Sequence, residues 1–224
     1  MPSDYNCTAV DIYPTHVISH TLTGSHGHLI RLPMLFPFKP GQVAGLTLND
    51  TIPVRIYSIA GSDFKNWIEF LFDVKSQGVL TPKLAELKAG DRIFMSKPFG
   101  TFVADERPAY WIAAGTGVAP FKIMANAGLY VNKYLIHGVG ESKDFYFREY
   151  FEETLGENYI KCCSRENSKD CFKGRITDYI EQLPTLPADI NYYLCGSAEM
   201  VIDTRDLLIS KGISFENIIA EIYF

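Results

Sequence analysis

The chain has 224 residues and a formal net charge of −5; 47% of its residues are hydrophobic, 13% aromatic and 21% charged. This composition is that of a globular protein with one large core or two smaller ones, and it excludes disordered and fibrous chains. No basic run appears, which argues against nucleic-acid binding. No window approaches the ~18 apolar residues of a membrane-spanning helix, and no charged, apolar leader begins the chain, so we expect a soluble, cytoplasmic protein.

Short β-type runs, each bounded by turn residues, fill the chain up to about residue 103. They cover 8–13, 28–32, 42–48, 54–58 and 68–74. Regular short strands of this kind predict an antiparallel barrel or a sandwich. One helix is expected over 81–88, with Thr81 as its N-cap, Pro82 at the first helical position and Gly90 beyond its end.

After a polar stretch at 104–108, strands alternate with helices. Strands are expected at 109–114, 134–139, 159–163, 192–195 and 218–223, and helices at 119–128, 145–154, 175–183 and 198–211. Near-continuous apolar strands predict a parallel sheet covered on both faces. We therefore divide the chain into two domains, 1–104 and 105–224.

The cysteines and histidines predict neither a disulfide framework nor a metal site. Five scattered cysteines are best interpreted as reduced thiols: Cys7, Cys162, Cys163, Cys171 and Cys195. His20, His26 and His28 cluster, but their spacing straddles a turn and no Cys or carboxylate set joins them. A polar hairpin is the better interpretation of these histidines, so no metal is predicted.

The segment Arg55-Ile-Tyr57-Ser58 ends a β-type run. Strand alternation puts Arg55 and Tyr57 on one face, where a guanidinium can pair with phosphate while an aromatic ring lies against a flat heterocycle. The segment can therefore hold a phosphorylated, aromatic ligand. A half-exposed strand with a surface arginine is the alternative interpretation.

The segment Gly78-Val79-Leu80-Thr81 leads into the expected helix. Unpaired N–H groups at a helix N-terminus favour phosphate or pyrophosphate, and the Thr81 hydroxyl adds a further donor. An ordinary N-cap is the alternative.

The segment Gly115-Thr116-Gly117-Val-Ala-Pro120 lies between an expected strand and helix. Its glycines let the backbone approach a ligand at the carboxyl end of a strand, where open α/β sheets bind their ligands. It is neither the GxGxxG fingerprint nor a P-loop, and a packing turn of small residues is the alternative. A fourth segment, Cys195-Gly-Ser-Ala-Glu-Met200, also follows a strand, and on its own it is equally typical of a buried, inert cysteine.

In this order and at these distances, the four segments resemble the ferredoxin–NADP reductase family, and a terminal Glu221-Ile-Tyr223 completes the set. Ser164-Arg-Glu-Asn and Gly174-Arg-Ile look closest to the bacterial ferredoxin and flavodoxin reductases. The resemblance implies an antiparallel β-barrel that binds FAD, followed by an α/β domain that binds NADP(H). It also implies hydride transfer between NADP(H) and flavin N5, and single-electron exchange with ferredoxin or flavodoxin.

The resemblance also implies roles for individual residues. Arg55 would bind the FAD pyrophosphate, Tyr57 would contact the flavin and Ser58 would face N5. The segment Gly78, Val79, Leu80 and Thr81 would offer backbone or hydroxyl groups to the FAD pyrophosphate. The strand residues Phe70, Leu71 and Phe72 would line the flavin.

In the second domain, the turn Gly115, Thr116 and Gly117 would meet the nicotinamide half of the nucleotide, with Ser58, Cys195 and Glu221 completing the catalytic site. Arg165 and Arg175 match positions that hold the 2′-phosphate, and Tyr223 or Phe224 would cover the flavin. Bacterial relatives often carry His-x-x-Arg after the second strand, whereas this chain has His137-Gly-Val-Gly140 and lacks that arginine.

Three other functions stay open. One is a flavin or oxygenase-type reductase, and another is an electron-transfer subunit of a larger complex. The iron–sulfur form of that subunit needs a C-x4-C-x2-C cluster, which Cys162, Cys163 and Cys171 do not form. The third is a flavin-binding sensor, against which the intact Cys195 and Glu221 argue.

Overall fold

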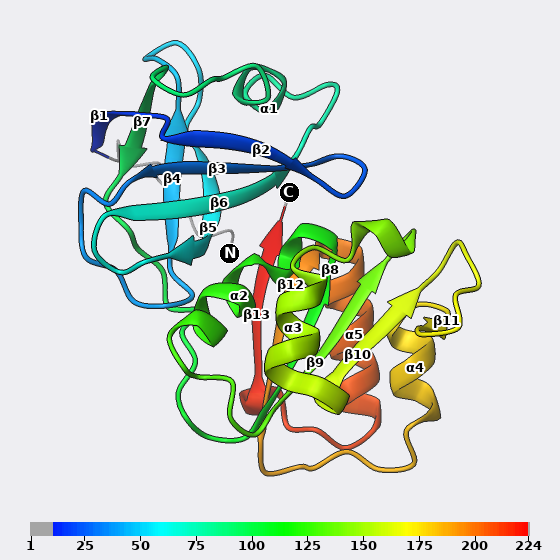
Figure 1. The fold of residues 1–224 in the computed structure, drawn as a ribbon. Coiled ribbons are helices and arrows are strands. Elements are labelled where there is room, and N and C mark those ends of the chain that lie inside the picture. The colour runs from blue at the N-terminus through cyan, green and yellow to red at the C-terminus, as the bar shows by residue number, and fades with distance from the viewer. Residues whose placement is uncertain (1–10, 224) are drawn as a thin grey trace, which may run out of the picture.

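The computed structural model describes residues 11–223 and contains two separate sheets (Figure 1). The first is antiparallel, with the order β1-β7-β4-β5-β6-β3-β2. Its strands are β1 (Ile12–His16), β2 (Ser19–Thr23), β3 (Gly27–Pro33), β4 (Val43–Thr47), β5 (Arg55–Ser62), β6 (Trp67–Asp73) and β7 (Arg92–Ser96). Within the described residues β1 and β2 do not pair with each other, so the sheet is barrel-like but open. The expected antiparallel architecture is confirmed.

The second sheet is parallel, with the order β11-β10-β9-β8-β12-β13. Its strands are β8 (Ala109–Ala114), β9 (Lys133–Val139), β10 (Tyr159–Cys163), β11 (Phe172–Lys173), β12 (Asn191–Ser197) and β13 (Ile218–Tyr223). The chain builds from β8 toward β11 and then returns to place β12 on the other side of β8. The strand order therefore reverses between β8 and β12, and crevices at such switch points bind ligands in open α/β sheets.

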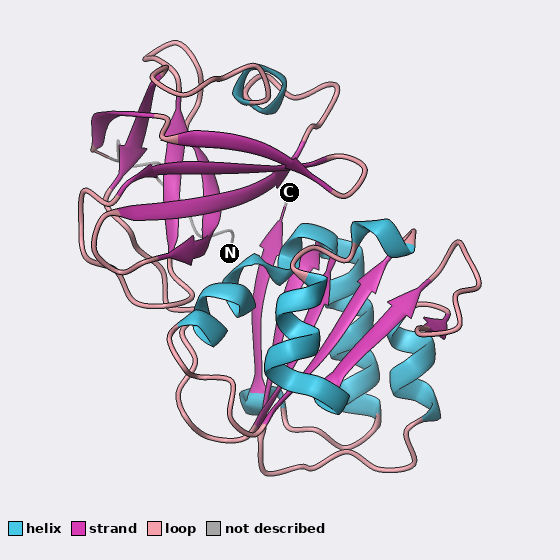
Figure 2. Ribbon diagram, in the orientation of Figure 1, coloured by secondary structure: helices cyan, strands magenta, loops and turns pink. Residues whose placement is uncertain are grey.

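Helices cover both faces of the parallel sheet (Figure 2). They are α2 (Ala119–Asn126), α3 (Arg148–Leu155), α4 (Ile176–Gln182) and α5 (Ala198–Ser210). One core contains Trp111, Phe121 and Phe151 on the α2–α3 side, and another contains Ile112, Ile180 and Leu208 on the α4–α5 side. The two-domain fold class predicted from the sequence is confirmed. None of the helices in residues 11–223 is long and apolar enough to cross a membrane.

The two sheets share a buried apolar interface. Strand β6 is buried on both faces, because Phe70 points into the barrel core whereas Leu71 joins the core around Trp111 and Phe121 of the second domain. In the opposite direction, Ile123 of α2 packs into the barrel core. This packing fixes the carboxyl edge of the parallel sheet against the barrel.

The expected helix at 81–88 is too long, and its predicted cap is wrong. Helix α1 spans Thr81–Leu84, and its N-cap is Leu80. The Thr81 hydroxyl instead accepts the Lys75 N–H at 2.9 Å and closes the loop before the helix. The next residues tighten into i→i+3 bonds, such as Leu87 N–H to the Leu84 carbonyl, which end the α-helix early.

Three strands were not predicted from the sequence. Strand β2 lies at the edge of the sheet and is polar, with Leu22 76% exposed, so it lacks an alternating apolar pattern. Strand β11 has only two residues. Strand β7 does alternate, with Ile93 and Met95 buried, so its apolar pattern in the sequence could have predicted it. The predicted run at 8–13 begins outside the described residues, and Cys7 lies outside them.

Candidate active site

A chain of polar groups joins the barrel to the last strand. The Tyr223 hydroxyl donates to Ser58 Oγ at 2.7 Å, and Ser58 donates to Glu221 Oε1 at 2.5 Å. Cys195 Sγ lies 4.0 Å from the same carboxylate oxygen. Strand β12 pairs with β13 so that Cys195 lies opposite Glu221. The structure therefore brings Ser58, Cys195 and Glu221, predicted as catalytic residues, into one cluster with Tyr223.

Burial controls the charge state of this cluster. It raises the pKa of the Glu221 carboxyl, while the hydrogen bond from Ser58 acts in the opposite direction. Burial and then the Glu221 carboxylate raise the pKa of the Cys195 thiol. Cys195 is therefore a neutral thiol at physiological pH and not a thiolate nucleophile.

The turn Gly115–Gly117 follows β8 and abuts the end of β12. A Cβ on Gly117 would lie 2.2 Å from the Cys195 carbonyl oxygen, so only glycine allows this approach. Gly115 has φ +53°, and a Cβ there would meet nothing within 4 Å. The turn is therefore packed on one side and open on the other, next to Cys195.

The barrel side of the site is formed by β5 and β6. Arg55 is exposed and has no ion-pair partner among residues 11–223, and the Tyr57 ring packs edge-on against Phe72 at 6.1 Å. Burial raises the pKa of Tyr57 to about 12, against the effect of Arg55. Phe70 is buried in the barrel core, which leaves only its backbone to meet a ligand, and Leu71 belongs to the domain interface.

The segment Gly78–Thr81 carries free backbone donors. Val79 is 57% exposed, and within the described part of the chain its N–H and that of Leu80 meet no acceptor. The Thr81 hydroxyl accepts the Lys75 N–H at 2.9 Å and lies 3.5 Å from the Lys75 carbonyl oxygen. The unpaired backbone N–H groups of Val79 and Leu80 are thus available donors of this segment.

The two predicted phosphate-binding arginines lie beyond the carboxyl ends of β10 and β11. The Arg165 side chain crosses Gly140, where a Cβ would lie 3.3 Å from its Cδ and Nε atoms. Arg165 thus lies over Gly140, the position that lacks the arginine of the His-x-x-Arg pattern. Arg175 is exposed, and its Nη1 atom lies 3.0 Å from Glu199 Oε1 of α5.

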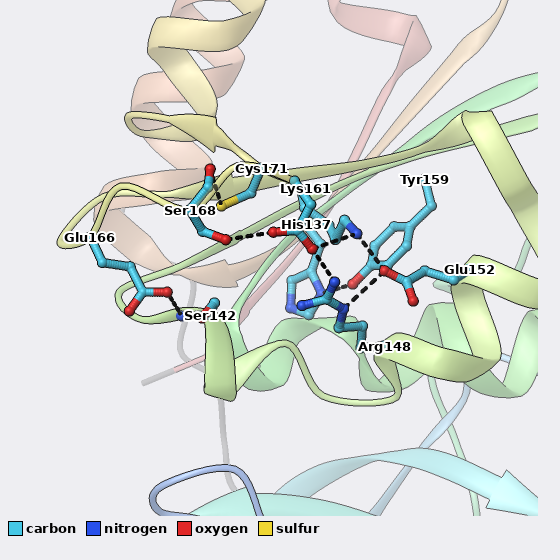
Figure 3. A network of polar contacts seen from close by, with 10 residues as sticks. His137, Ser142, Arg148, Glu152, Tyr159, Lys161, Glu166, Ser168 and Cys171 are labelled. Carbon is cyan, nitrogen blue, oxygen red and sulfur yellow. Dashed lines mark hydrogen bonds and ion pairs between the residues drawn. The ribbon is translucent and has the colours of Figure 1, made fainter.

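The loop that carries Arg165 is anchored on two sides (Figure 3). Glu166 accepts the Ser142 N–H at 2.8 Å from the loop after β9. On the other side, Arg148 of α3 forms ion pairs with both Asp170 and Glu152, and Lys161 also pairs with Glu152. These contacts hold the loop before any ligand binds.

Further contacts were not foreseen from the sequence. The Tyr146 hydroxyl donates to Asp73 Oδ1 at 2.8 Å, and the Ser25 N–H donates to Asp144 Oδ1 at 2.8 Å. Both bonds tie the barrel to the segment after β9. Their partners are at least 73 residues apart in the chain and match no local motif, so no sequence signal indicated them. The predicted flavin-covering residue Phe224 lies outside the described residues.

The polar hairpin expected around the histidines is β2–β3. His20 Nε2 lies 2.9 Å from His28 Nδ1, and the His28 ring stacks on Phe72. Within residues 11–223 no group of three or more His, Cys, Asp or Glu side chains is arranged to hold a metal ion.

Comparison with known proteins identifies the family. The oxidoreductase NAD-binding domain family matches residues 111–206. The ferredoxin–NADP reductase of Azotobacter vinelandii is 30% identical over 209 residues, which cover 79% of this chain and 80% of that protein. The chain belongs to the ferredoxin–NADP reductase family. It is therefore a member of a family of oxidoreductases, as its motifs predicted.

The chain is also similar to a protein named as part of a dioxygenase system. The toluate 1,2-dioxygenase electron transfer component of Pseudomonas putida is 29% identical over 191 residues, and this chain spans 57% of its length. Among solved structures, a ferredoxin NADP+ reductase from Neisseria gonorrhoeae with bound FAD and NADP has a TM-score of 0.85 at 19% identity, with 95% of this chain and 99% of that chain covered. This likeness shows the shared fold.

Proposed function

We propose that the chain is an FAD-dependent reductase that exchanges a hydride with NADP(H) and single electrons with ferredoxin or flavodoxin. In this proposal residues 1–104 form the FAD domain and 105–224 the nucleotide domain. The observation that carries it is the cluster of Ser58, Cys195 and Glu221, which the two domains build together beside the Gly115–Gly117 turn.

The residues of the barrel fit FAD by their donor chemistry. Arg55 offers an unpaired guanidinium, and Val79 and Leu80 offer unpaired backbone N–H groups, which together suit a pyrophosphate. The Tyr57 ring is fixed edge-on by Phe72 and suits a flat heterocycle. FAD, when bound, supplies the step between two-electron and one-electron chemistry.

The residues of the second domain fit a nicotinamide nucleotide. The open face of the turn at Gly115 lies at the switch point of the sheet, beside the neutral Cys195 thiol. Arg165 and Arg175 supply cationic groups at the far side for a 2′-phosphate. The nucleotide would thus span the carboxyl edge of the sheet.

Ser58 is the central residue of the proposed reaction site. Its hydroxyl accepts from Tyr223 and donates to Glu221, so the serine proton is directed at the carboxylate. Tyr223 is fixed over this site by the same bond, and it must move before another ring can stack there. Glu221 and Ser58 would then orient the ring that replaces it.

An oxygenase component is the second candidate for the electron acceptor. The likeness to the toluate dioxygenase component, and to a cytochrome P450 reductase from Amycolatopsis at 25% identity with a TM-score of 0.84, favours it. That comparison covers 95% of this chain and 70% of the P450 reductase. Rates with ferredoxin, flavodoxin and an oxygenase, each from the same organism, distinguish the acceptors.

Flavin retention tests the barrel site. Arg55→Ala removes the unpaired guanidinium, and a charge-assisted contact is worth about 1.5–3 kcal/mol, so we expect FAD to bind at least tenfold more weakly. The measurement is FAD affinity of the deflavinated protein. Arg205→Ala, a surface change on α5, is the matched control and leaves that affinity unchanged. Equal affinity in the two variants removes Arg55 from the site.

Nucleotide choice tests the Arg175 assignment. Glu199 competes with a phosphate for Arg175, so Glu199→Gln is expected to raise the preference for NADPH over NADH about threefold, the size of an exposed ion pair. The measurement is the ratio of kcat/KM for NADPH to kcat/KM for NADH. The control is Glu157→Gln, an exposed residue just before β10, at the amino edge of the parallel sheet. A ratio that does not change in Glu199→Gln contradicts the assignment of Arg175 to the phosphate.

A further inference from the structure

A buried histidine reaches the nucleotide-binding turn from the neighbouring strand. His137 in β9 is 0% exposed and lies opposite Ala113 of β8. Its Nε2 atom is 3.2 Å from the Gly115 carbonyl oxygen. Its Nδ1 atom is 3.1 Å from the Tyr159 hydroxyl, and Figure 3 shows these two side chains together. The imidazole thus bridges β10 and the turn after β8.

Only one arrangement of protons satisfies these contacts. Burial lowers the pKa of His137 to about 4, so the ring is neutral at physiological pH and carries one N–H. The Gly115 carbonyl only accepts, which places that hydrogen on Nε2. Nδ1 then accepts from Tyr159, whose phenol keeps its proton because burial raises its pKa.

The bond to Gly115 completes the support of the turn. Gly117 packs against the Cys195 carbonyl on the β12 side, so closely that a Cβ there would lie 2.2 Å from the carbonyl oxygen. His137 fixes the carbonyl of Gly115, a residue with left-handed φ, on the β9 side. Thr116 lies between these two supports and is the residue expected to meet the nicotinamide half.

We propose that His137 is a positioning residue for nicotinamide-nucleotide binding. Its neutral ring holds the Gly115 carbonyl, with the tautomer set by Tyr159, so that the Gly115–Gly117 turn has its binding conformation before the nucleotide arrives. This inference rests on the proposed function of that turn and adds a residue with no exposed surface to the site.

Kinetics of three variants test the inference. His137→Phe keeps an aromatic ring but removes both nitrogens, so it raises the KM for NADPH about tenfold with ferricyanide as acceptor, with a smaller change in kcat and no change in FAD content. Tyr159→Phe removes only the tautomer control and raises KM about threefold. Tyr192→Phe is the matched control, because its hydroxyl bonds the Pro187 carbonyl at 2.7 Å in the same sheet, and its KM stays at the wild-type value.

A wild-type KM in a folded His137→Phe variant overturns the inference, as does an equal increase in the Tyr192→Phe control. If His137→Phe does not fold, Tyr159→Phe decides by the same criterion. Nitrogen-15 NMR of the histidines of the wild-type protein gives an independent result: a neutral Nε2–H ring supports the inference, and a neutral Nδ1–H ring or a charged ring overturns it. A wild-type protein that NADPH does not reduce refutes the proposed function instead, and the NMR result is independent of that failure.

Discussion

Replacing Ser58 by alanine is expected to slow the reduction of bound FAD by NADPH about a hundredfold. The hydroxyl links Tyr223 to Glu221 across the two domains, so its loss breaks both hydrogen bonds at once. Removal of one preorganised donor in an active site typically costs 10²–10³ in rate, that is, about 2.7–4 kcal/mol. The measurement is the single-turnover rate of flavin reduction under anaerobic conditions.

The same variant is expected to shift the pH dependence of the rate in a defined direction. Ser58 donates to the Glu221 carboxylate and thereby lowers its pKa, which burial raises. Without this bond the pKa of Glu221 rises further, so the pH at which the carboxyl ionises moves upward in Ser58→Ala. Ser62→Ala removes another buried hydroxyl of β5, which bonds the Trp67 carbonyl at 2.7 Å, and is the control. Equal rates and profiles in the two variants exclude Ser58 from the reaction site.

Replacing Gly117 by alanine is expected to abolish turnover with NADPH almost completely, with a loss of at least a hundredfold in kcat/KM. The new Cβ would lie 2.2 Å from the Cys195 carbonyl oxygen and 2.6 Å from its carbon, both of which are backbone atoms. The turn and the end of β12 must therefore separate, and overpacking of this kind costs about 1–3 kcal/mol of stability. Steady-state kinetics and thermal unfolding measure the two effects.

Gly128→Ala separates lost stability from lost geometry. Gly128 follows α2 with φ +85°, and a Cβ there meets nothing within 4 Å. Alanine at this φ costs about 1 kcal/mol, which is comparable to the lower cost at Gly117, but it leaves the turn intact. If Gly117→Ala retains activity like Gly128→Ala, the turn does not contact the nucleotide.

The fold was largely predictable because local sequence patterns determine its strands and helices. The change from short strands with turn residues to alternating strands and helices near residue 105 gave the two sheet types. The burial of Leu71 in β6 could not be predicted in this way, because the other domain buries this side chain and no local pattern indicates that contact. The start of α1 depended on the bond between Thr81 and Lys75 and its end on i→i+3 bonds, and a capping rule anticipates neither.

Individual ligand-binding segments could be predicted from their residues, but their assembly into one site was predictable only through the family resemblance. Ser58 and Glu221 are 163 residues apart, and neither residue type nor spacing connects them. The pairing of Arg175 with Glu199 and of His137 with Gly115 depends on sheet register and loop position, so these pairs became visible only in the structure. Arg165 illustrates the same limit, since its path across Gly140 follows from two loops that are distant in sequence.

The most direct test of the proposed function is anaerobic mixing of the FAD-loaded protein with NADPH and, separately, with NADH. We expect a yellow protein that releases FAD on denaturation and whose flavin absorbance is bleached by NADPH faster than by NADH. A protein that does not bind added FAD, or a flavin-loaded protein that neither nucleotide bleaches, would contradict it.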